Sequence, residues 1–186
     1  MSLKDDGSLV ALCKSGDREA FGELVRRYQR PVYYLALRLI GDSDEANDLA
    51  QEVFLRAYRG IENFRGSSTF KTWLYTIANN LIKNHYRSAR RRMTVSIEGR
   101  EIPVNADEME NLLSKEMSEI LRGAIAELPY KQRMALTLRI YDGLTHREIA
   151  DVLGCSEGTV KVNFHHAINS LRKRMVPIGK GGRNEL

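Results

Sequence analysis

The sequence predicts an all-α protein made of two small helical domains that a flexible linker joins. Apolar residues recur at helical spacing along most of the chain, and no strand-like alternation of useful length occurs. Between the two periodic parts the composition changes: apolar periodicity is weak and acidic residues gather. We therefore expect an N-terminal domain over residues 1–92, an acidic linker over 93–116, a C-terminal domain over 117–176, and a glycine-rich, disordered tail over 177–186.

The first part of the chain, residues 5–41, is expected to be helical and to supply core. Asp17 is suited to cap a helix start, because its carboxylate can accept from free backbone amides. Pro31 should kink this helix or begin a new one, since proline lacks the amide hydrogen that a helix interior needs. Gly41 is expected to end it.

The next helix should begin at Ser43 or Asp44 and carries an acidic, polar outer face. Its buried stripe is expected to consist of Leu49, Val53, Phe54, Ala57 and Tyr58. Acids in a first turn suit the helix dipole, which is the simplest interpretation of this face. The acids continue into later turns, where the dipole stabilises them little, so we favour a surface that binds a basic protein partner.

A Gly/Ser loop over residues 63–69 precedes a helix of very regular apolar spacing. From Asn63 to Ile97 there is no acidic residue, against seven lysines and arginines. Amide side chains on such a helix can hydrogen-bond base edges, and the basic side chains can hold phosphates. The loop beside it could accept an unstacked base. The alternative interpretation is a basic helix that is merely solvated. On the apolar face of the same helix, Trp73 is expected to be a packing anchor and not a ligand platform.

The C-terminal domain should contain two packing helices followed by a helix-turn-helix. Residues 116–128 form the first, and Pro129 suits the first turn of the second, which ends at residues 141–143. The helix-turn-helix is signalled by a capping box of Thr145 and Glu148, by Gly154 where a left-handed residue is needed, and by Ser156 as the next cap.

The last helix has two distinct faces. One arc is apolar and consists of Val160, Phe164, Ala167, Ile168 and Leu171. The opposite arc carries Gly158, Val162, His165, His166, Asn169 and Lys173, and no acidic residue lies between Glu157 and Glu185. This pattern is typical of a recognition helix for the DNA major groove, although an ordinary helical hairpin with a solvated basic face would look similar.

The net charge, the cysteine usage and the hydropathy pattern favour a cytoplasmic protein with a polyanionic partner. The net charge is +5, and Cys13 and Cys155 lack metal-ligand spacing, so we expect two reduced thiols. The N-terminus carries no signal-peptide pattern, and no apolar run is long enough to cross a bilayer. Among the enzyme classes, no nucleophile elbow, P-loop or dinucleotide fingerprint occurs, and no metal ligand joins His165 and His166. We expect no catalysis, cofactor or metal.

The order of these parts resembles the bacterial RNA polymerase sigma factors of the extracytoplasmic-function (ECF) group. The similarity spans about residues 17–175 and rests on four stretches in family-like order: residues 48–58 (DLAQEVFLRAY), residues 64–66 with 70–80 (FRG and FKTWLYTIANN), Leu128-Pro129, and residues 158–161 (GTVK). The resemblance implies a sigma region 2 domain, a sigma region 4 domain, and a linker whose acids mimic RNA charge in the polymerase channel.

The resemblance also implies the partners and the residues that meet them. Core RNA polymerase would be bound through the clamp helices of its β′ subunit and through its β flap, and the clamp helices would meet Asp48, Gln51 and Glu52. The −10 promoter element would be read and opened by Arg65, Gly66, Ser67, Ser68, Thr69, Asn80, Lys83, Asn84 and Arg87. The −35 element would be read by Ser156, Gly158, Thr159, Lys161, Val162, His165, His166 and Lys173. An anti-sigma factor would hold the protein inactive until a stress signal arrives.

One departure from the family pattern lies in the last helix. Family members often carry arginine at the positions of Asn163 and His166. This difference puts the usual −35 preference in question, because Val162 could contact a thymine methyl and the histidines could donate to guanine or phosphate. The alternative function is a stand-alone helix-turn-helix transcription regulator. This alternative accounts for residues 119–175 but assigns no function to the N-terminal domain.

Overall fold

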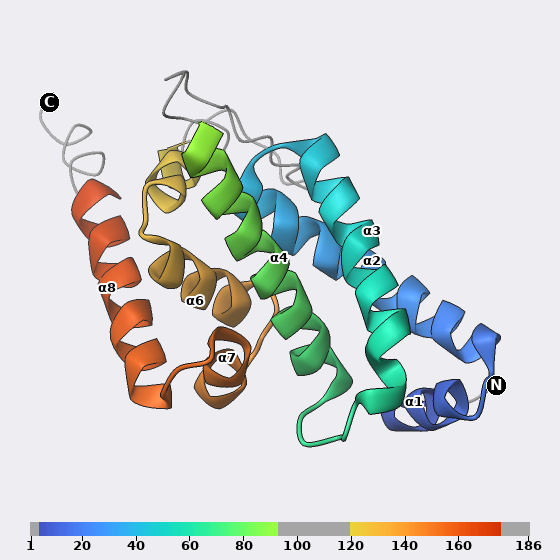
Figure 1. The fold of residues 1–186 in the computed structure, drawn as a ribbon. Coiled ribbons are helices and arrows are strands. Elements are labelled where there is room, and N and C mark those ends of the chain that lie inside the picture. The colour runs from blue at the N-terminus through green and yellow to red at the C-terminus, as the bar shows by residue number, and fades with distance from the viewer. Residues whose placement is uncertain (1–3, 93–119, 176–186) are drawn as a thin grey trace, which may run out of the picture. The chain divides into compact units, whose positions relative to one another are not determined.

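The computed structural model describes residues 4–92 and 120–175, and within these ranges the regular structure is entirely helical (Figure 1). The chain divides into two compact units. The first holds α1 to α4, and the second holds nearly all of the chain from residue 120 onward. The predictions made for the 93–116 linker and the 177–186 tail lie outside the described residues.

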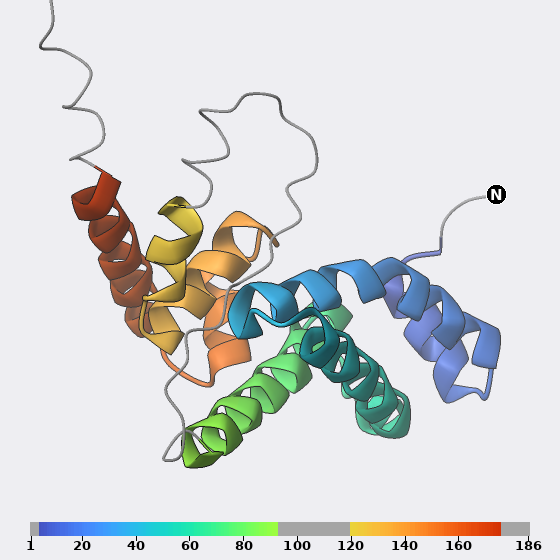
Figure 2. The same ribbon diagram turned by 90° about the horizontal axis from the view of Figure 1, so that it is seen from above.

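The N-terminal unit is built from four α-helices and a short 3-10 turn. These are α1 (Asp6–Lys14), α2 (Arg18–Ile40), α3 (Ser43–Gly60), η1 (Ile61–Asn63) and α4 (Phe70–Arg92). Figure 2 shows α2 crossing α3 and α4, and α2 also packs against α1. Between η1 and α4 lies a short connection, residues 64–69, which we call the 64–69 loop.

Local signals placed most of the helix ends correctly in this unit. The Asp17 carboxylate accepts from the amides of Glu19 and Ala20, and Gly41 ends α2 with a φ of 84°. α3 begins at Ser43, one of the two predicted starts, and its cap is Asp42, which accepts from two amides of the first turn. α2 runs without interruption through Pro31, so no new helix begins there. Buried residues on both sides of the proline, such as Leu24 and Leu35, pack in one core and favour continuity.

The core of the unit lies among α2, α3 and α4, with aromatic rings at one end. Phe64, Phe70 and Trp73 pack against one another in tilted and edge-to-face arrangements with centroid separations of 5.0–6.3 Å, which confirms Trp73 as a packing residue. Near the other end of α4, the Tyr86 hydroxyl donates to the carbonyl of Leu39 and so ties α4 to α2.

Tyr58 departs from the predicted buried stripe of α3. Its side chain is 47% exposed, although Val53 and Ala57 on the same helix are fully buried. The ring packs edge-to-face with Phe21, at 5.0 Å between centroids. The apolar arc of α3 is thus wider than the surface that α2 covers, and its margin remains accessible.

The C-terminal unit is a helical segment over residues 120–126 followed by α6 (Tyr130–Ile140), α7 (His146–Leu153) and α8 (Glu157–Met175). Residues 116–119 of the predicted first helix lie outside the described part. Pro129 stands at the cap of α6, just before its first turn. The apolar arc of α8 is confirmed as core: Ala167 and Leu171 pack with Ala124, Leu128 and Leu136.

Candidate functional site

The turn between α7 and α8 has the geometry of a helix-turn-helix. Thr145 and Glu148 form the capping box in both directions: the Glu148 amide donates to Thr145 Oγ1 at 3.2 Å, and the Thr145 amide donates to Glu148 Oε2 at 2.8 Å. Gly154 adopts a φ of 63°, which ends α7, and the Ser156 hydroxyl accepts from the Thr159 amide at 3.2 Å. These caps fix where α8 begins, and therefore which side chains leave its first turns.

The face of α8 opposite its core is accessible over three turns. Val162 lies on this face and is 55% exposed. The predicted −35 residues Ser156, Gly158, Lys161, His165, His166 and Lys173 are exposed on this helix, and Thr159 is half-buried. Lys161 Nζ lies 2.8 Å from Glu157 Oε1, and this contact lowers the pKa of the Glu157 carboxyl. The residues predicted to read the −35 element therefore lie together on an accessible face of α8 and at its cap.

Two side chains of α8 are oriented by their own helix. The Asn169 amide lies 2.8 Å from His165 Nε2; when it donates there, the proton of the neutral ring sits on Nδ1. Asn163 donates instead to the Thr159 carbonyl at 2.8 Å, so its amide is turned back onto the helix. Of the two positions where the family often has arginine, only His166 presents an exposed side chain.

The predicted −10 residues fall into two groups in the N-terminal unit. Arg65, Gly66, Ser67 and Thr69 are exposed in the 64–69 loop, and Ser68 is half-buried. Gly66 has a φ of 72°, a conformation that glycine adopts without strain. On α4, the side chains of Asn80, Asn84 and Arg87 are exposed, and Lys83 is half-buried. The loop and the α4 face each offer hydrogen-bond donors and acceptors to solvent.

The predicted polymerase-binding residues lie on the outer side of α3. Asp48 and Gln51 are exposed, and Glu52 is paired with Arg56 at 2.7 Å across one helical turn. Exposed pairs of this kind are weak, so Glu52 can exchange Arg56 for another cation at little cost.

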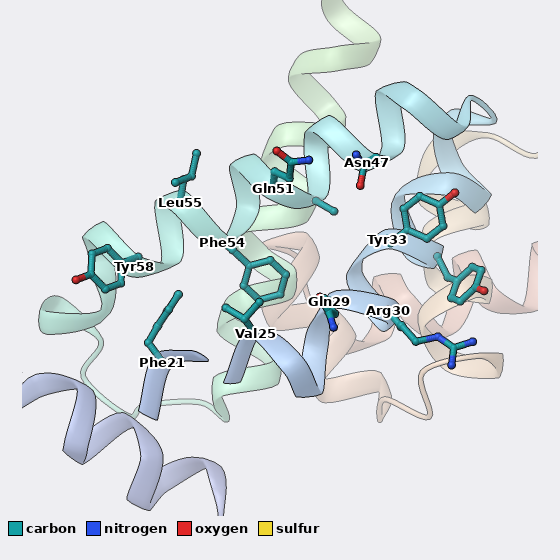
Figure 3. A pocket seen from close by; sticks show the side chains of 12 residues that line it. Phe21, Val25, Gln29, Arg30, Tyr33, Asn47, Gln51, Phe54, Leu55 and Tyr58 are labelled. Atoms are coloured by element: carbon teal, nitrogen blue, oxygen red, sulfur yellow. The ribbon is translucent and has the colours of Figure 1, made fainter. Parts of the chain in front are cut away.

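Beside these residues lies an apolar groove of about 640 Å³ that the sequence did not reveal (Figure 3). Its walls come from α2 and α3, and Gln51 is the only one of the three predicted polymerase-binding residues that lines it. Leu55 and Tyr58, which are 51% and 47% exposed, form its open edge, and Phe21, Val25 and Phe54 form its floor (Figure 3). Leu55, an apolar residue outside the predicted buried stripe of α3, was the available signal in the sequence, because solvated helix faces are usually polar.

Comparison with known families assigns both units. The family described as Sigma-70 region 2 matches residues 24–92, and the family described as Sigma-70, region 4 matches residues 118–171. The RNA polymerase sigma-H factor of Pseudomonas aeruginosa is 37% identical over 188 residues, covering 96% of this chain and 97% of the relative. The ECF RNA polymerase sigma-E factor of Escherichia coli K12 is also 37% identical, over 93% of this chain and 95% of its own length. The chain belongs to the ECF group of RNA polymerase sigma factors.

Two solved structures share the fold. CnrH in complex with the cytosolic domain of CnrY has a TM-score of 0.69 at 23% identity, covering 92% of this chain and 97% of that one. The sigma factor RpoE in complex with the anti-sigma factor NepR from Bartonella quintana has a TM-score of 0.73 at 24% identity, covering 83% and 96%. In the described part of this sigma factor, no helix combines the length and the apolar character needed to cross a membrane.

Proposed function

We propose that this sigma factor binds core RNA polymerase and directs it to promoters by recognising −35 and −10 elements and helping to open the DNA. The observation that carries the proposal is the pair of sigma region matches, in order, in a chain that aligns with sigma factors over nearly its whole length. A stand-alone regulator is not favoured, because it would use the C-terminal unit alone. The proposed action requires no catalysis by the chain itself and takes place in the cytoplasm, where the polymerase and the DNA lie.

Each surface is proposed to have one role. The α3 face of Asp48, Gln51 and Glu52, with the adjoining α2–α3 groove, would dock on the β′ clamp helices. Exposed carboxylates give such docking its orientation, and the exposed apolar edge of Leu55 and Tyr58 supplies area to bury. The region 4 unit would contact the β flap.

The DNA-binding roles follow the same division. The 64–69 loop and the α4 face would engage the −10 element, and α8 would enter the major groove of the −35 element. On α8, Val162 offers a methyl contact to thymine, whereas His165 and His166 offer donors to guanine or phosphate. We propose that the −35 preference of this protein differs from that of relatives with two arginines on this helix.

Regulation by an anti-sigma factor is proposed on the strength of the relatives. One structural neighbour of this fold, RpoE from Bartonella quintana, was solved in complex with the anti-sigma factor NepR. The α2–α3 groove is accessible and apolar, which suits an amphipathic helix of such a partner. A partner that occupied this groove would compete with the polymerase, and a stress signal would release it.

The function is tested by transcription in vitro. Purified protein and core polymerase are incubated with genomic DNA fragments, and the 5′ ends of the transcripts are sequenced. We expect initiation from a small set of promoters that core polymerase alone ignores. If the protein only shifts duplex DNA and never directs the polymerase, the regulator is the correct function.

The docking assignment is tested by charge reversal on α3. The double variant Asp48→Lys, Glu52→Lys should abolish polymerase binding, because two attractive contacts become repulsive, while circular dichroism and unfolding remain unchanged. The matched control is Glu19→Lys, Glu62→Lys, which makes the same charge change at exposed positions of the same unit. Polymerase affinity that is equal in the two double variants would refute the assignment.

A further inference from the structure

The outer face of α8 carries a hydrogen-bonded pair of side chains, His165 and Asn169. The sequence predicts a −35 contact for His165 and assigns none to Asn169 on the same face. Residues four apart in a helix are neighbours on its surface, and here the Asn169 Nδ2 atom lies 2.8 Å from His165 Nε2. The amide therefore occupies the nitrogen of the ring that lies farther from the backbone.

This contact determines which nitrogen of the neutral His165 ring can donate. In a neutral imidazole one nitrogen carries a proton and the other accepts. The amide nitrogen of Asn169 can only donate, so Nε2 is the acceptor and the proton lies on Nδ1. Nδ1 is then the polar ring atom that remains for DNA, and it offers a donor.

A donor at Nδ1 selects for an acceptor in the major groove. Purines present N7 as an acceptor there, guanine O6 and thymine O4 also accept, and cytosine presents a donor. A pair of side chains one helical turn apart is weak in water, but hydrogen bonds strengthen where a bound duplex excludes water. Asn169 is half-buried on α8, so its amide has less conformational freedom to lose when the complex forms.

An amide can pair with His165 in both charge states of the ring. When the ring is protonated both nitrogens donate, and rotation of the Asn169 amide by half a turn offers Oδ1 to Nε2. Nδ1 therefore remains a donor in either state. A carboxylate in the same place could not serve in this way, because it only accepts and requires the proton of a neutral ring to lie on Nε2.

The charged groups around this face have contacts of their own. On α8 itself, Lys161 is paired with Glu157, and the His166 ring lies edge-on to the His165 ring with centroids 6.4 Å apart. α6 packs on the opposite, apolar arc of α8, and His146 of α7 packs against Phe164 of that arc. The other charged or titratable side chains of α6, α7 and the last turns of α8 are Tyr130, Lys131, Arg133, Arg139, Arg147, Glu148, Asp151, Arg172, Lys173 and Arg174.

We propose that Asn169 is a positioning residue of the −35 site: it keeps Nε2 of His165 paired, so that Nδ1 presents a donor to N7 of one purine in either charge state. The inference rests on the proposed −35 role of α8 and adds to it a residue and a direction of hydrogen bonding. The ligand is the major-groove edge of a purine in duplex DNA. Asn169 acts through His165 and does not itself contact the base.

The first experiment locates the purine. Each purine of the −35 element, in a promoter mapped by transcription in vitro, is replaced in turn by its 7-deaza analogue, which has a carbon in place of N7. Binding of holoenzyme to intact and modified promoter is compared at the same pH, so that effects of pH and net charge on the whole complex cancel in the ratio. Native holoenzyme should bind about fivefold more weakly when the contacted purine is modified, the effect of one lost hydrogen bond.

Substitution of the ring identifies His165 as the donor. His165→Phe keeps a ring and removes both nitrogens, so it should abolish the sensitivity at that one purine and leave the others unchanged. The matched control is His166→Phe, at the adjacent exposed position, which should keep the sensitivity at that purine. If no purine loses its sensitivity in His165→Phe, the inference is wrong.

The second experiment tests Asn169 through a pH profile. Asn169→Asp has nearly the same shape but can only accept, so at about pH 8.5, where histidine is ordinarily neutral, Nδ1 has no proton and the sensitivity should disappear. At about pH 5.5 the protonated ring donates from both nitrogens, and the sensitivity should return. Native holoenzyme should show it at both pH values.

Two further variants separate this role from a structural one. Asn169→Gln can still donate to Nε2 and should behave as the native protein. Asn163→Asp makes the same charge change on the same helix, at a side chain that contacts the Thr159 carbonyl, and should also keep the sensitivity at both pH values. If Asn169→Asp keeps the sensitivity at the higher pH, or loses it at both, Asn169 does not position His165.

Failure of the inference is distinguishable from failure of the proposed function. If native holoenzyme initiates at mapped promoters but the variants of His165 and Asn169 leave every ratio unchanged, the pair has no part in reading the −35 element. If native holoenzyme initiates nowhere, the proposed function itself is wrong.

Discussion

Individual side chains in this protein have structural roles that depend on one or two contacts. Asp6, Arg27 and Tyr28 form a small polar group that joins α1 to α2, and it is partly buried. Burial and the hydrogen bond to Asp6 raise the pKa of Tyr28 well above its ordinary value of 10.0. The phenol therefore remains a donor at every pH at which the protein would be studied.

Tyr28→Phe should lower the free energy of unfolding by about 1–3 kcal/mol at neutral pH, because the Asp6 carboxylate loses a hydrogen bond. The pKa of Tyr28 is higher in the folded chain than in the unfolded one, so protonated Tyr28 favours the folded chain. The difference between native and variant should be complete below pH 10 and should shrink as pH rises above it. Urea unfolding at several pH values measures this difference.

Tyr33→Phe is the matched control for this prediction. Its ring packs against Tyr34, and among the described residues its hydroxyl has no hydrogen-bond partner. We expect a change within about 0.5 kcal/mol at any pH. An equal loss in both variants would show that the Tyr28–Asp6 contact contributes nothing specific.

At the scale of elements, the helix-turn-helix depends on where α7 ends and α8 begins. Gly154 adopts a positive φ with nothing within 4 Å of an added Cβ, so its requirement is one of backbone conformation alone. Gly158, four residues later, has ordinary helical geometry and an added Cβ would lie 3.9 Å from Ser156 Oγ, an ordinary contact. Substitution by alanine at these two glycines is therefore expected to change the free energy of unfolding in different ways.

Gly154→Ala should lower the free energy of unfolding by about 1–2 kcal/mol, the cost of a left-handed conformation for a residue with a Cβ. Gly158→Ala should leave it unchanged or raise it by up to about 1 kcal/mol, because alanine is the better helix former. Thermal unfolding followed by circular dichroism measures both. A loss in Gly158→Ala as large as that in Gly154→Ala would mean that the turn is not held by the backbone of Gly154.

The ends of helices could be predicted from the sequence where the residues that set them lie close together in the chain. Asp17, Gly41, the Thr145–Glu148 box and Gly154 each act on amides or carbonyls within a few residues, so the sequence shows both partners at once. The core stripes of α4 and α8 followed from helical spacing for the same reason.

The sites were less predictable because they join distant residues. The α2–α3 groove depends on how far α2 covers α3, and spacing on one helix does not show this, which is why Tyr58 was assigned to the core. The hydrogen bond from the Lys14 ammonium to the carbonyl of Phe64, at the start of the 64–69 loop, spans 50 residues, and the sequence pattern of α1 alone gives no reason to expect it. The residue roles predicted for the promoter and the polymerase remain predictions.

For the whole molecule, the proposed function assigns separate promoter elements to separate units. Asn80 belongs to the unit of α1 to α4, and Lys161 belongs to the unit that contains α8. Asn80 is exposed on α4 without a charge, so we assign it to base contact in opened DNA, whereas Lys161 on α8 is assigned to duplex DNA.

Asn80→Ala should therefore impair opening more than duplex binding, and Lys161→Ala should do the reverse. Permanganate footprinting measures opening, and competition with a −35 duplex measures binding. Because these side chains lie on separate units and share no partner, we do not expect them to couple. For each measurement, the free-energy losses of the two single variants should add within about 0.5 kcal/mol in the double variant. Equal losses of opening and duplex binding in Asn80→Ala would argue against a −10 role for α4. A strongly non-additive double variant would mean that the two units read promoter DNA as one surface.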